Sequence, residues 1–237
     1  MTGAARLDEL AAKYELPPTA ATRFAGLLEL VATEPAAITS VRDPAQGVDV
    51  HVADSLVALD VPAVRGARRI ADLGAGGGFP GLVLAIALPE AWVALIESVR
   101  RKCAFLRGAA ERLELSNVEV VCARAEEWRP GIGAHDLVTA RALASLPVLV
   151  EYATPLLRLG GTLVAWKSAA ARAEEADAAA AARTLGMTPP TAIGVEPFAG
   201  AGERYLYLSS KVSPTPPGYP RRAGMARKRP IQASGGR

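Results

Sequence analysis

The sequence predicts an α/β protein with a doubly wound, mostly parallel sheet, and three observations support this fold class. Short apolar runs alternate with helix-compatible segments between residues 69 and 210. A run of glycines follows the first apolar segment, at Gly74, Gly76 and Gly78. Half of the 237 residues are hydrophobic but only 5% are aromatic. Alternating strands and helices build a parallel sheet covered by helices, and small apolar residues suit that packing.

Two helices are expected before the sheet, in an N-terminal helical extension over residues 1–65. The first spans residues 19–33, where apolar positions recur at helical spacing and Thr19 is a suitable N-cap. The second spans residues 43–59 and is stopped by Pro62, which cannot continue a helix.

The sheet domain is predicted over residues 66–211. Its strands are expected at residues 69–73, 92–97, 118–122, 136–140, 162–167, 191–195 and 204–210. Its helices are expected at residues 81–88, 100–115, 146–157 and 169–185. Beyond the sheet, residues 212–237 form a tail whose prolines and glycines are expected to break all regular structure.

The segment from Ile70 to Gly78 indicates a nucleoside cofactor. A buried strand delivers the chain into a glycine turn, where the backbone can approach a ligand closely. The next strand ends in Glu97, about twenty residues later, and an acidic residue at that distance can accept both hydroxyls of a ribose. The sequence therefore predicts cofactor contacts at Gly74, Gly76 and Glu97.

A dinucleotide site is the alternative, because the pattern G-x-G-x-x-G fits Gly76, Gly78 and Gly81. That register begins late, since the turn already opens at Gly74. It also places Pro80 where a pyrophosphate needs free N–H groups, and proline has none. The block resembles instead motif I of the S-adenosylmethionine (SAM) methyltransferases, whose ligand carries no phosphate. An antiparallel strand in the closing pair is also typical of their sheets.

Cysteine usage and hydropathy predict a cytoplasmic protein. Cys103 and Cys122 stand in no metal or redox spacing, and each is expected to be a small buried apolar residue. No secretory signal and no apolar run long enough to cross a bilayer are expected. The sequence predicts no metal site, no membrane partner and no obligate protein partner.

Charge is divided unevenly along the chain. Because the whole chain carries +3 and the seven basic residues from Lys211 onward carry +7 without an acid, residues 1–210 carry −4. A basic tail on an acidic body predicts a polyanionic partner near the C-terminus. The tail residues assigned to this contact are Arg221, Arg222, Arg227, Lys228 and Arg229. The alternative is a solvated, disordered terminus. The tail lies outside the predicted sheet, so its removal is expected to leave cofactor binding unchanged.

Six blocks of the chain together resemble one family, the bacterial methyltransferases that modify guanine N7 in the 530 loop of 16S ribosomal RNA, formerly called glucose-inhibited division protein B. The blocks are Thr39-Ser40-Val41-Arg42-Asp43, His51 with Asp54-Ser55-Leu56, Asp72 to Gly81, Arg124-Ala125-Glu126-Glu127, Thr139-Ala140-Arg141-Ala142, and Tyr219 to Met225 with Lys228-Arg229-Pro230.

The resemblance implies SAM as the cofactor, with family contacts falling on Gly74, Phe79, Ala125, Glu126 and Arg141. It also implies 16S rRNA or the small ribosomal subunit as the substrate. Guanine N7 carries no proton, so methylation there needs alignment and exclusion of water rather than a general base. No catalytic residue is assigned. An NAD-dependent oxidoreductase and a non-catalytic ribosome-assembly RNA-binding protein remain the alternatives.

Several single residues have more than one interpretation. Arg141 can pair with Glu126 or a cofactor carboxylate, or hold the target base or a phosphate. His51 is as consistent with a packed histidine as with a functional one. Arg42 and Lys167 can contact RNA phosphates, although isolated basic residues near loops usually do little. The tryptophans Trp92, Trp128 and Trp166 are expected in the core or at its rim rather than as base-stacking platforms.

Overall fold

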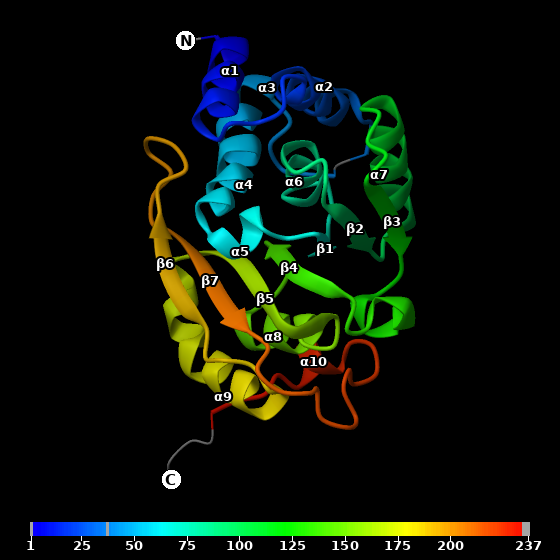
Figure 1. The fold of residues 1–237 in the computed structure, drawn as a ribbon, viewed down its shortest axis with the longest axis vertical. Helices are drawn as coiled ribbons and strands as arrows, with labels where there is room; N and C mark the ends of the chain where they lie inside the picture. Colours follow the sequence, from blue (N-terminus) through cyan, green and yellow to red (C-terminus); the bar gives the residue numbers. More distant parts are fainter. Residues whose placement is uncertain (1, 37, 234–237) are drawn as a thin grey trace.

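The computed structural model describes residues 2–36 and 38–233, which form a seven-stranded sheet covered by helices on both faces (Figure 1). The strands lie in the order β3-β2-β1-β4-β5-β7-β6. Neighbours from β3 to β5 pair in parallel, whereas β7 runs antiparallel to both β5 and β6. The strands are β1 (Arg69–Leu73), β2 (Trp92–Glu97), β3 (Val118–Cys122), β4 (His135–Arg141), β5 (Leu157–Ser168), β6 (Thr191–Val195) and β7 (Arg204–Ser210). This confirms the predicted doubly wound, mostly parallel sheet.

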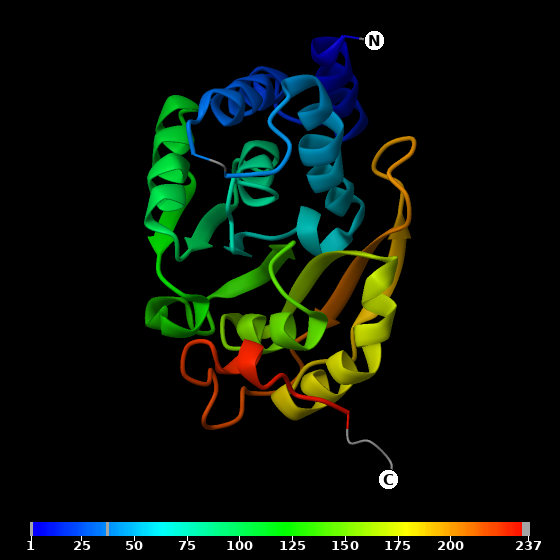
Figure 2. The same ribbon diagram turned by 180° about the vertical axis from the view of Figure 1, so that it is seen from behind.

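Side chains alternate between two apolar cores, one on each face of the sheet. Ile70 of β1 joins the core on one face and Ala71 joins the other, as the two-residue period of a strand requires. The N-terminal helices and α6 pack on the first face, and α8 and α9 pack on the second (Figure 2). The principal helices are α1 (Gly3–Lys13), α2 (Ala20–Thr33), α5 (Pro62–Arg65), α6 (Gly81–Ala87), α7 (Arg100–Arg112), α8 (Leu146–Ala153), α9 (Glu175–Leu185) and α10 (Met225–Lys228).

The order of winding reverses at the centre of the sheet. From β1 the chain moves outward to β2 and β3, and it then returns to place β4 on the other side of β1. The loops after β1 and β4 therefore separate and leave a crevice at the carboxyl ends of the strands, where ligands bind in open α/β sheets.

The prediction of one continuous helix at residues 43–59 is wrong. The segment is divided into α3 (Pro44–Gly47), the π-helical turn η1 (Val48–Ala53), α4 (Asp54–Leu56) and the 3-10 turn η2 (Val57–Asp60). Within it, the Val50 carbonyl and the Asp54 carboxylate both accept hydrogen bonds from Arg141. Wide turns of this kind inside helices are frequent at functional sites.

Other boundaries differ more modestly from those predicted. Helix α1 was not predicted, Thr19 makes no side-chain cap of α2, and the helix expected from residue 169 begins as the 3-10 turn η5 (Ala169–Glu174). Helices α7 and α8 end earlier than expected, and β5 begins earlier. Of the cysteines, Cys103 is buried as predicted but Cys122 is exposed. The side chain of Cys122 lies at the end of an outer strand, which leaves it uncovered.

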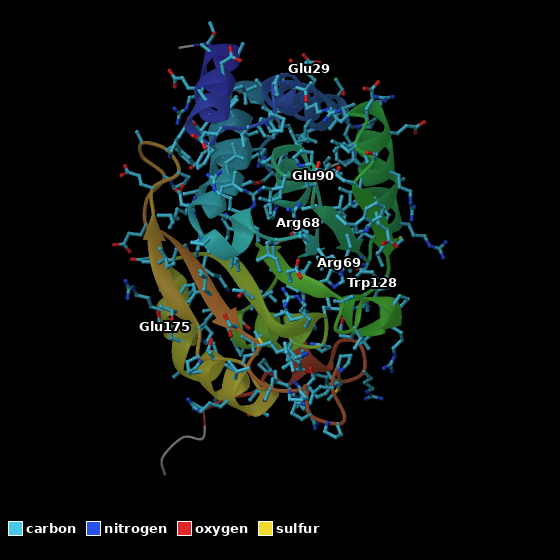
Figure 3. All side chains as sticks on the ribbon, in the orientation of Figure 1. Glu29, Arg68, Arg69, Glu90, Trp128 and Glu175 are labelled. Carbon is cyan, nitrogen blue, oxygen red and sulfur yellow. The ribbon has the colours of Figure 1, made fainter. Side chains whose placement is uncertain are left out.

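The tryptophans occupy core and rim positions. Trp92 opens β2 and is exposed, and Trp166 of β5 is buried. Trp128 lies in the loop between β3 and β4 (Figure 3) and packs against His135, with the ring centroids 5.2 Å apart. These placements confirm the predicted core or rim positions.

The tail is ordered where the structure describes it, contrary to the expectation that it lacks regular structure. It contains α10, its Ala226 is buried, and Arg221 forms an ion pair with Glu151 of α8. Figure 1 shows α10 beside α8. The last tail residues, 234–237 with the predicted basic Arg237, lie outside the described residues. In the described part of the chain, none of the helices combines the length and the hydropathy needed to span a membrane.

A buried carboxylate joins the first strand to the glycine turn. Asp72 is fully buried and accepts hydrogen bonds from the Gly81 N–H at 3.1 Å and from Thr139 Oγ1 of β4 at 2.8 Å. A Cβ atom at Gly81 would overlap Leu95 and lie 2.6 Å from Asp72 Oδ2, so this position requires glycine. Burial raises the pKa of Asp72 to about 7.

The raised pKa of Asp72 predicts how stability depends on pH. The folded protein holds a proton at Asp72 that the unfolded chain releases above its ordinary pKa of 3.8, so stability falls as pH rises from about 4 to about 7. The expected slope is at most about 1.4 kcal/mol per pH unit. Urea unfolding of the wild type and of Asp72→Asn between pH 4.5 and 7 measures it. Equal pH slopes in the two proteins would contradict the prediction.

Candidate functional site

The turn after β1 brings the backbone close to the end of β2. Gly74 has φ +67°, and the N–H groups of Gly74 and Ala75 donate to the Ile96 carbonyl at 2.8 and 3.1 Å. A Cβ atom at Gly74 would lie 2.6 Å from Leu143 Cδ1. Both the backbone conformation and the lack of space therefore favour glycine at this position.

A cavity of about 390 Å³, here called the glycine-loop cavity, opens at the carboxyl ends of β1 to β4. Its position is the crevice that the strand order predicts. Its wall combines apolar, acidic and basic side chains with backbone of the glycine turn. The lining residues are Leu73, Gly74, Ile96, Glu97, Ser98, Lys102, Ala123, Arg124, Ala125, Glu126, Ala142, Leu143, Tyr152 and Arg227.

Glu97 is held in place at the end of β2. Its Oε2 accepts from the Gly76 N–H at 3.1 Å and its Oε1 accepts from the Val99 N–H at 2.8 Å. The side chain is buried yet lines the cavity. Because each carboxylate oxygen can accept more than one hydrogen bond, Glu97 keeps acceptor capacity for a ligand.

The loop after β3 forms the opposite wall. Arg124, Ala125 and Glu126 line the cavity, and Glu126 Oε1 accepts from the Gly224 N–H of the tail at 2.9 Å. Tyr152 of α8 lies at the same wall, where burial and the nearby Glu126 carboxylate raise its pKa. Glu126 of this loop is therefore next to α8 and to the tail, two elements that lie far away in the sequence.

A second cavity of about 530 Å³, here called the Arg141 cavity, lies on the other side of the β4 loop. It is lined by Thr39, Ser40, Val41, Val50, His51, Asp54, Arg141, Ala142, Ala144, Trp166, Lys167, Ser168, Val195, Phe198, Arg204 and Tyr205. The two cavities share Ala142, a non-glycine residue with φ +53°. Left-handed backbone at such a residue costs energy and is concentrated at functional sites.

Arg141 is fixed by three acceptors from the N-terminal extension. Its Nη1 donates to Asp54 Oδ2 at 2.7 Å and to the Val50 carbonyl at 2.9 Å, and its Nη2 donates to His51 Nδ1 at 3.3 Å. Both side chains of the ion pair are largely buried. The pairing of Arg141 with Glu126, one of the predicted alternatives, is wrong, because the partner is Asp54.

His51 is a packed, neutral histidine. Its Nδ1 accepts from Arg141, so its Nε2–H donates to the Val41 carbonyl at 2.9 Å. Burial lowers its pKa. The imidazole stacks on the Phe79 ring, with centroids 4.2 Å apart and an interplanar angle of 8°. The Arg141 guanidinium lies 5.5 Å from the centre of the same ring, so these three side chains form one cluster.

Two basic residues considered for RNA phosphates are bound to protein oxygens. Lys167 Nζ donates to the Ala144 carbonyl and to Glu174 Oε2, each at 2.9 Å. Arg42 donates to the carbonyls of Ala32 and Glu34 at the end of α2. A phosphate contact by either residue would have to replace these bonds.

The structure brings together some of the predicted cofactor residues and separates others. Gly74, Glu97, Ala125 and Glu126 line the glycine-loop cavity. Gly76 supports Glu97 through its N–H, Phe79 stacks on His51, and Arg141 lines the neighbouring cavity. The sequence predicts no role for Leu143 or Tyr152, and it predicts a polyanion contact rather than a cofactor role for Arg227. Asp54 stood within a recognised block of residues, but no local pattern indicates that it pairs with Arg141.

Comparison with known proteins gives the same family from a family model and from individual relatives. The family described as "GidB: rRNA small subunit methyltransferase G" matches residues 19–194. The protein of Rubrobacter xylanophilus named ribosomal RNA small subunit methyltransferase G is 42% identical to this chain, over 84% of this chain and 78% of that protein. The corresponding protein of Roseiflexus castenholzii is 44% identical over 82% of this chain and 83% of its own length.

Solved structures show the same fold. A SAM-dependent O-methyltransferase of Thermotoga maritima has a TM-score of 0.53 at 16% identity, over 69% of this chain and 66% of that one. The O-methyltransferase TomG of Streptomyces achromogenes, in complex with SAM, has a TM-score of 0.50 at 23% identity, over 68% and 79%. The sheet is therefore of the SAM-dependent methyltransferase type. With a family match over most of its length, the chain belongs to the rRNA small subunit methyltransferase G family of SAM-dependent methyltransferases.

Proposed function

We propose that this protein transfers a methyl group from SAM to N7 of a guanine in the 530 loop of 16S rRNA. The observation that carries the proposal is the meeting of two cavities at Ala142, in a chain of this family. The glycine-loop cavity is assigned to SAM and the Arg141 cavity to the guanine. A transfer between two molecules needs their reacting atoms to meet at one point, and the shared residue marks that point.

The residues of the glycine-loop cavity fit SAM. The Glu97 carboxylate, fixed by two N–H groups, is placed to accept the ribose hydroxyls. Ile96 and Leu143 give apolar contact for the adenine, and the absence of a side chain at Gly74 lets the ligand approach the backbone. The loop of Ala125 and Glu126 is assigned to the adenine edge.

The proposed methyl transfer requires mainly that the protein align the guanine with the methyl group of SAM. SAM supplies a methyl group activated by its sulfonium centre. Guanine N7 has an in-plane lone pair and no proton, so the protein has to orient the base and exclude water rather than remove a proton. Arg141 and Ala142, at the boundary between the cavities, are placed for this orienting role.

The Arg141 cavity has the features of a base pocket. Phe198 and Tyr205 provide aromatic surface for stacking, as proteins that act on a flipped nucleotide require. Arg204 is an exposed cation at the rim and can neutralise a phosphate. In the tail, the exposed Arg222, Lys228 and Arg229 are assigned to further phosphates. Because the chain belongs to a methyltransferase family, the NAD-dependent oxidoreductase and the non-catalytic RNA-binding protein are rejected as alternatives.

The ribose contact is tested by Glu97→Ala. We expect SAM to bind about 5- to 150-fold more weakly, because ribose hydroxyls lose an acceptor worth about 1–3 kcal/mol. Isothermal titration calorimetry measures the affinity, and a thermal melt checks that the variant is folded. Unchanged affinity in a folded variant would contradict the assignment of SAM to this cavity.

The role of Arg141 is tested by Arg141→Lys. Lysine keeps the charge opposite Asp54 but loses the planar fork that also reaches His51. We expect the single-turnover rate of methyl transfer to fall about tenfold or more, with a small change in Tm, because alignment carries the reaction. Near-normal turnover would assign Arg141 to folding alone, and Arg141→Ala would then show mainly a loss of stability.

The substrate is tested in cells. N7-methylguanosine in the 530 loop of 16S rRNA should be present in wild-type cells, absent after deletion of the gene, and restored by this protein. Complementation with Glu97→Ala is the matched control, because that variant is expected to keep the Arg141 cavity intact. A methyl mark that persists after deletion would contradict the proposed function.

A further inference from the structure

The C-terminal segment Tyr219–Arg229, here called the strap, is anchored by a buried ion pair. Arg221 Nε donates to Glu151 Oε1 at 2.6 Å, and Arg221 Nη2 donates to Glu151 Oε2. The same Nη2 donates to the Arg229 carbonyl at 3.0 Å. Glu151 is only 2% exposed on α8. Such a two-pronged arginine–carboxylate pair fixes both position and orientation, so the strap is docked and is not a solvated tail in this structure.

Two contacts connect the docked strap to the glycine-loop cavity. The Gly224 N–H donates to Glu126 Oε1 at 2.9 Å, and Arg227 Nη2 donates to the Leu143 carbonyl at 2.8 Å. Arg227 itself lines the cavity. The strap therefore supplies part of the wall and holds two other parts of it, one after β3 and one after β4.

The contact with Leu143 reaches the glycine turn. Leu143 follows Ala142, whose positive φ is costly for a residue with a side chain, and its Cδ1 atom occupies the space beside Gly74. Arg227 fixes the carbonyl of Leu143 and Lys167 fixes that of Ala144. Strained backbone persists only where several surrounding contacts fix its conformation, and the strap supplies one of these contacts here.

We propose that the strap is part of the cofactor site, with Arg221 as a positioning residue and Arg227 as a wall residue, so that docking of the strap strengthens SAM binding. The inference rests on the proposed assignment of SAM to the glycine-loop cavity. It replaces the expectation that removal of the tail leaves SAM binding unchanged. Coupling between two binding equilibria is reciprocal, so SAM also stabilises the docked strap.

The first test measures SAM affinity in the full-length protein without RNA. Arg221→Ala and Arg227→Ala are compared with Arg222→Ala, which removes the same charge from an exposed position that forms no ion pair within the described residues. We expect SAM to bind about tenfold more weakly to the first two variants, since each loses at least one hydrogen bond that shapes the site, and equally well to Arg222→Ala.

The second test measures docking directly. Trypsin cleaves after arginine and lysine, so its rate of cleavage within residues 221–229 reports the undocked population. Saturating SAM should slow this cleavage in the wild type and in Arg222→Ala. The effect should be lost in Arg221→Ala. Because Arg221→Ala leaves Glu151 buried without its partner, Arg227→Ala, at an exposed position, serves as the variant that keeps the fold.

Unchanged SAM affinity in folded Arg221→Ala and Arg227→Ala, together with cleavage that SAM does not slow, would overturn the inference. Glu97→Ala separates this result from failure of the proposed function. If Glu97→Ala weakens SAM binding while the strap variants do not, the cavity assignment stands and the role of the strap is wrong. If Glu97→Ala also binds SAM normally, the cavity assignment itself fails.

Discussion

The hydrogen bonds of the Asp72 carboxylate are the constraint on which the rest of the site depends. One carboxylate, fully buried at the end of β1, accepts from the N–H of Gly81 where the glycine turn enters α6 and from Thr139 on β4. It thereby fixes the two edges of the crevice in which ligands bind. Burying a carboxylate is unfavourable, as its pKa of about 7 shows. Retaining this group at that cost is consistent with a requirement for geometry rather than for stability.

The Ala142–Leu143 turn is the second constraint, because it separates and joins the two cavities. Its left-handed residue would relax if the turn were free. Three elements prevent this: Arg141 is held by Asp54 from the N-terminal extension, Lys167 of β5 binds the Ala144 carbonyl, and Arg227 of the strap binds the Leu143 carbonyl. The N-terminal extension and the C-terminal strap, at opposite ends of the sequence, therefore meet at the turn where cofactor and base are proposed to meet.

The sequence predicts features that depend on neighbouring residues, but not contacts between residues that lie far apart along the chain. The sheet and the glycine turn are local patterns of two to ten residues, and the structure confirms the fold class. Arg141 and Asp54 lie 87 residues apart, and Arg221 and Glu151 lie 70 apart, and no periodic signal marks such pairs. The prediction of one continuous helix at residues 43–59 is wrong for the same reason. The local composition favours a helix, but the distant Arg141 binds the oxygens of Val50 and Asp54 at a π-helical turn.

Only some of the basic side chains in the C-terminal region are available to bind RNA phosphates. Lys211 donates to the carbonyls of Thr154 and Leu157, Arg221 is paired with Glu151, and Arg227 donates to Leu143. The side chains of these three cations donate to protein oxygens, whereas those of Arg222, Lys228 and Arg229 are exposed and form no ion pair within the described residues. Only a cation that neutralises a phosphate releases counterions, at about 0.7 of log–log slope for each single-strand contact. The salt dependence of RNA binding should therefore reflect the cations whose side chains are not bound to protein oxygens, and not the full charge of this region.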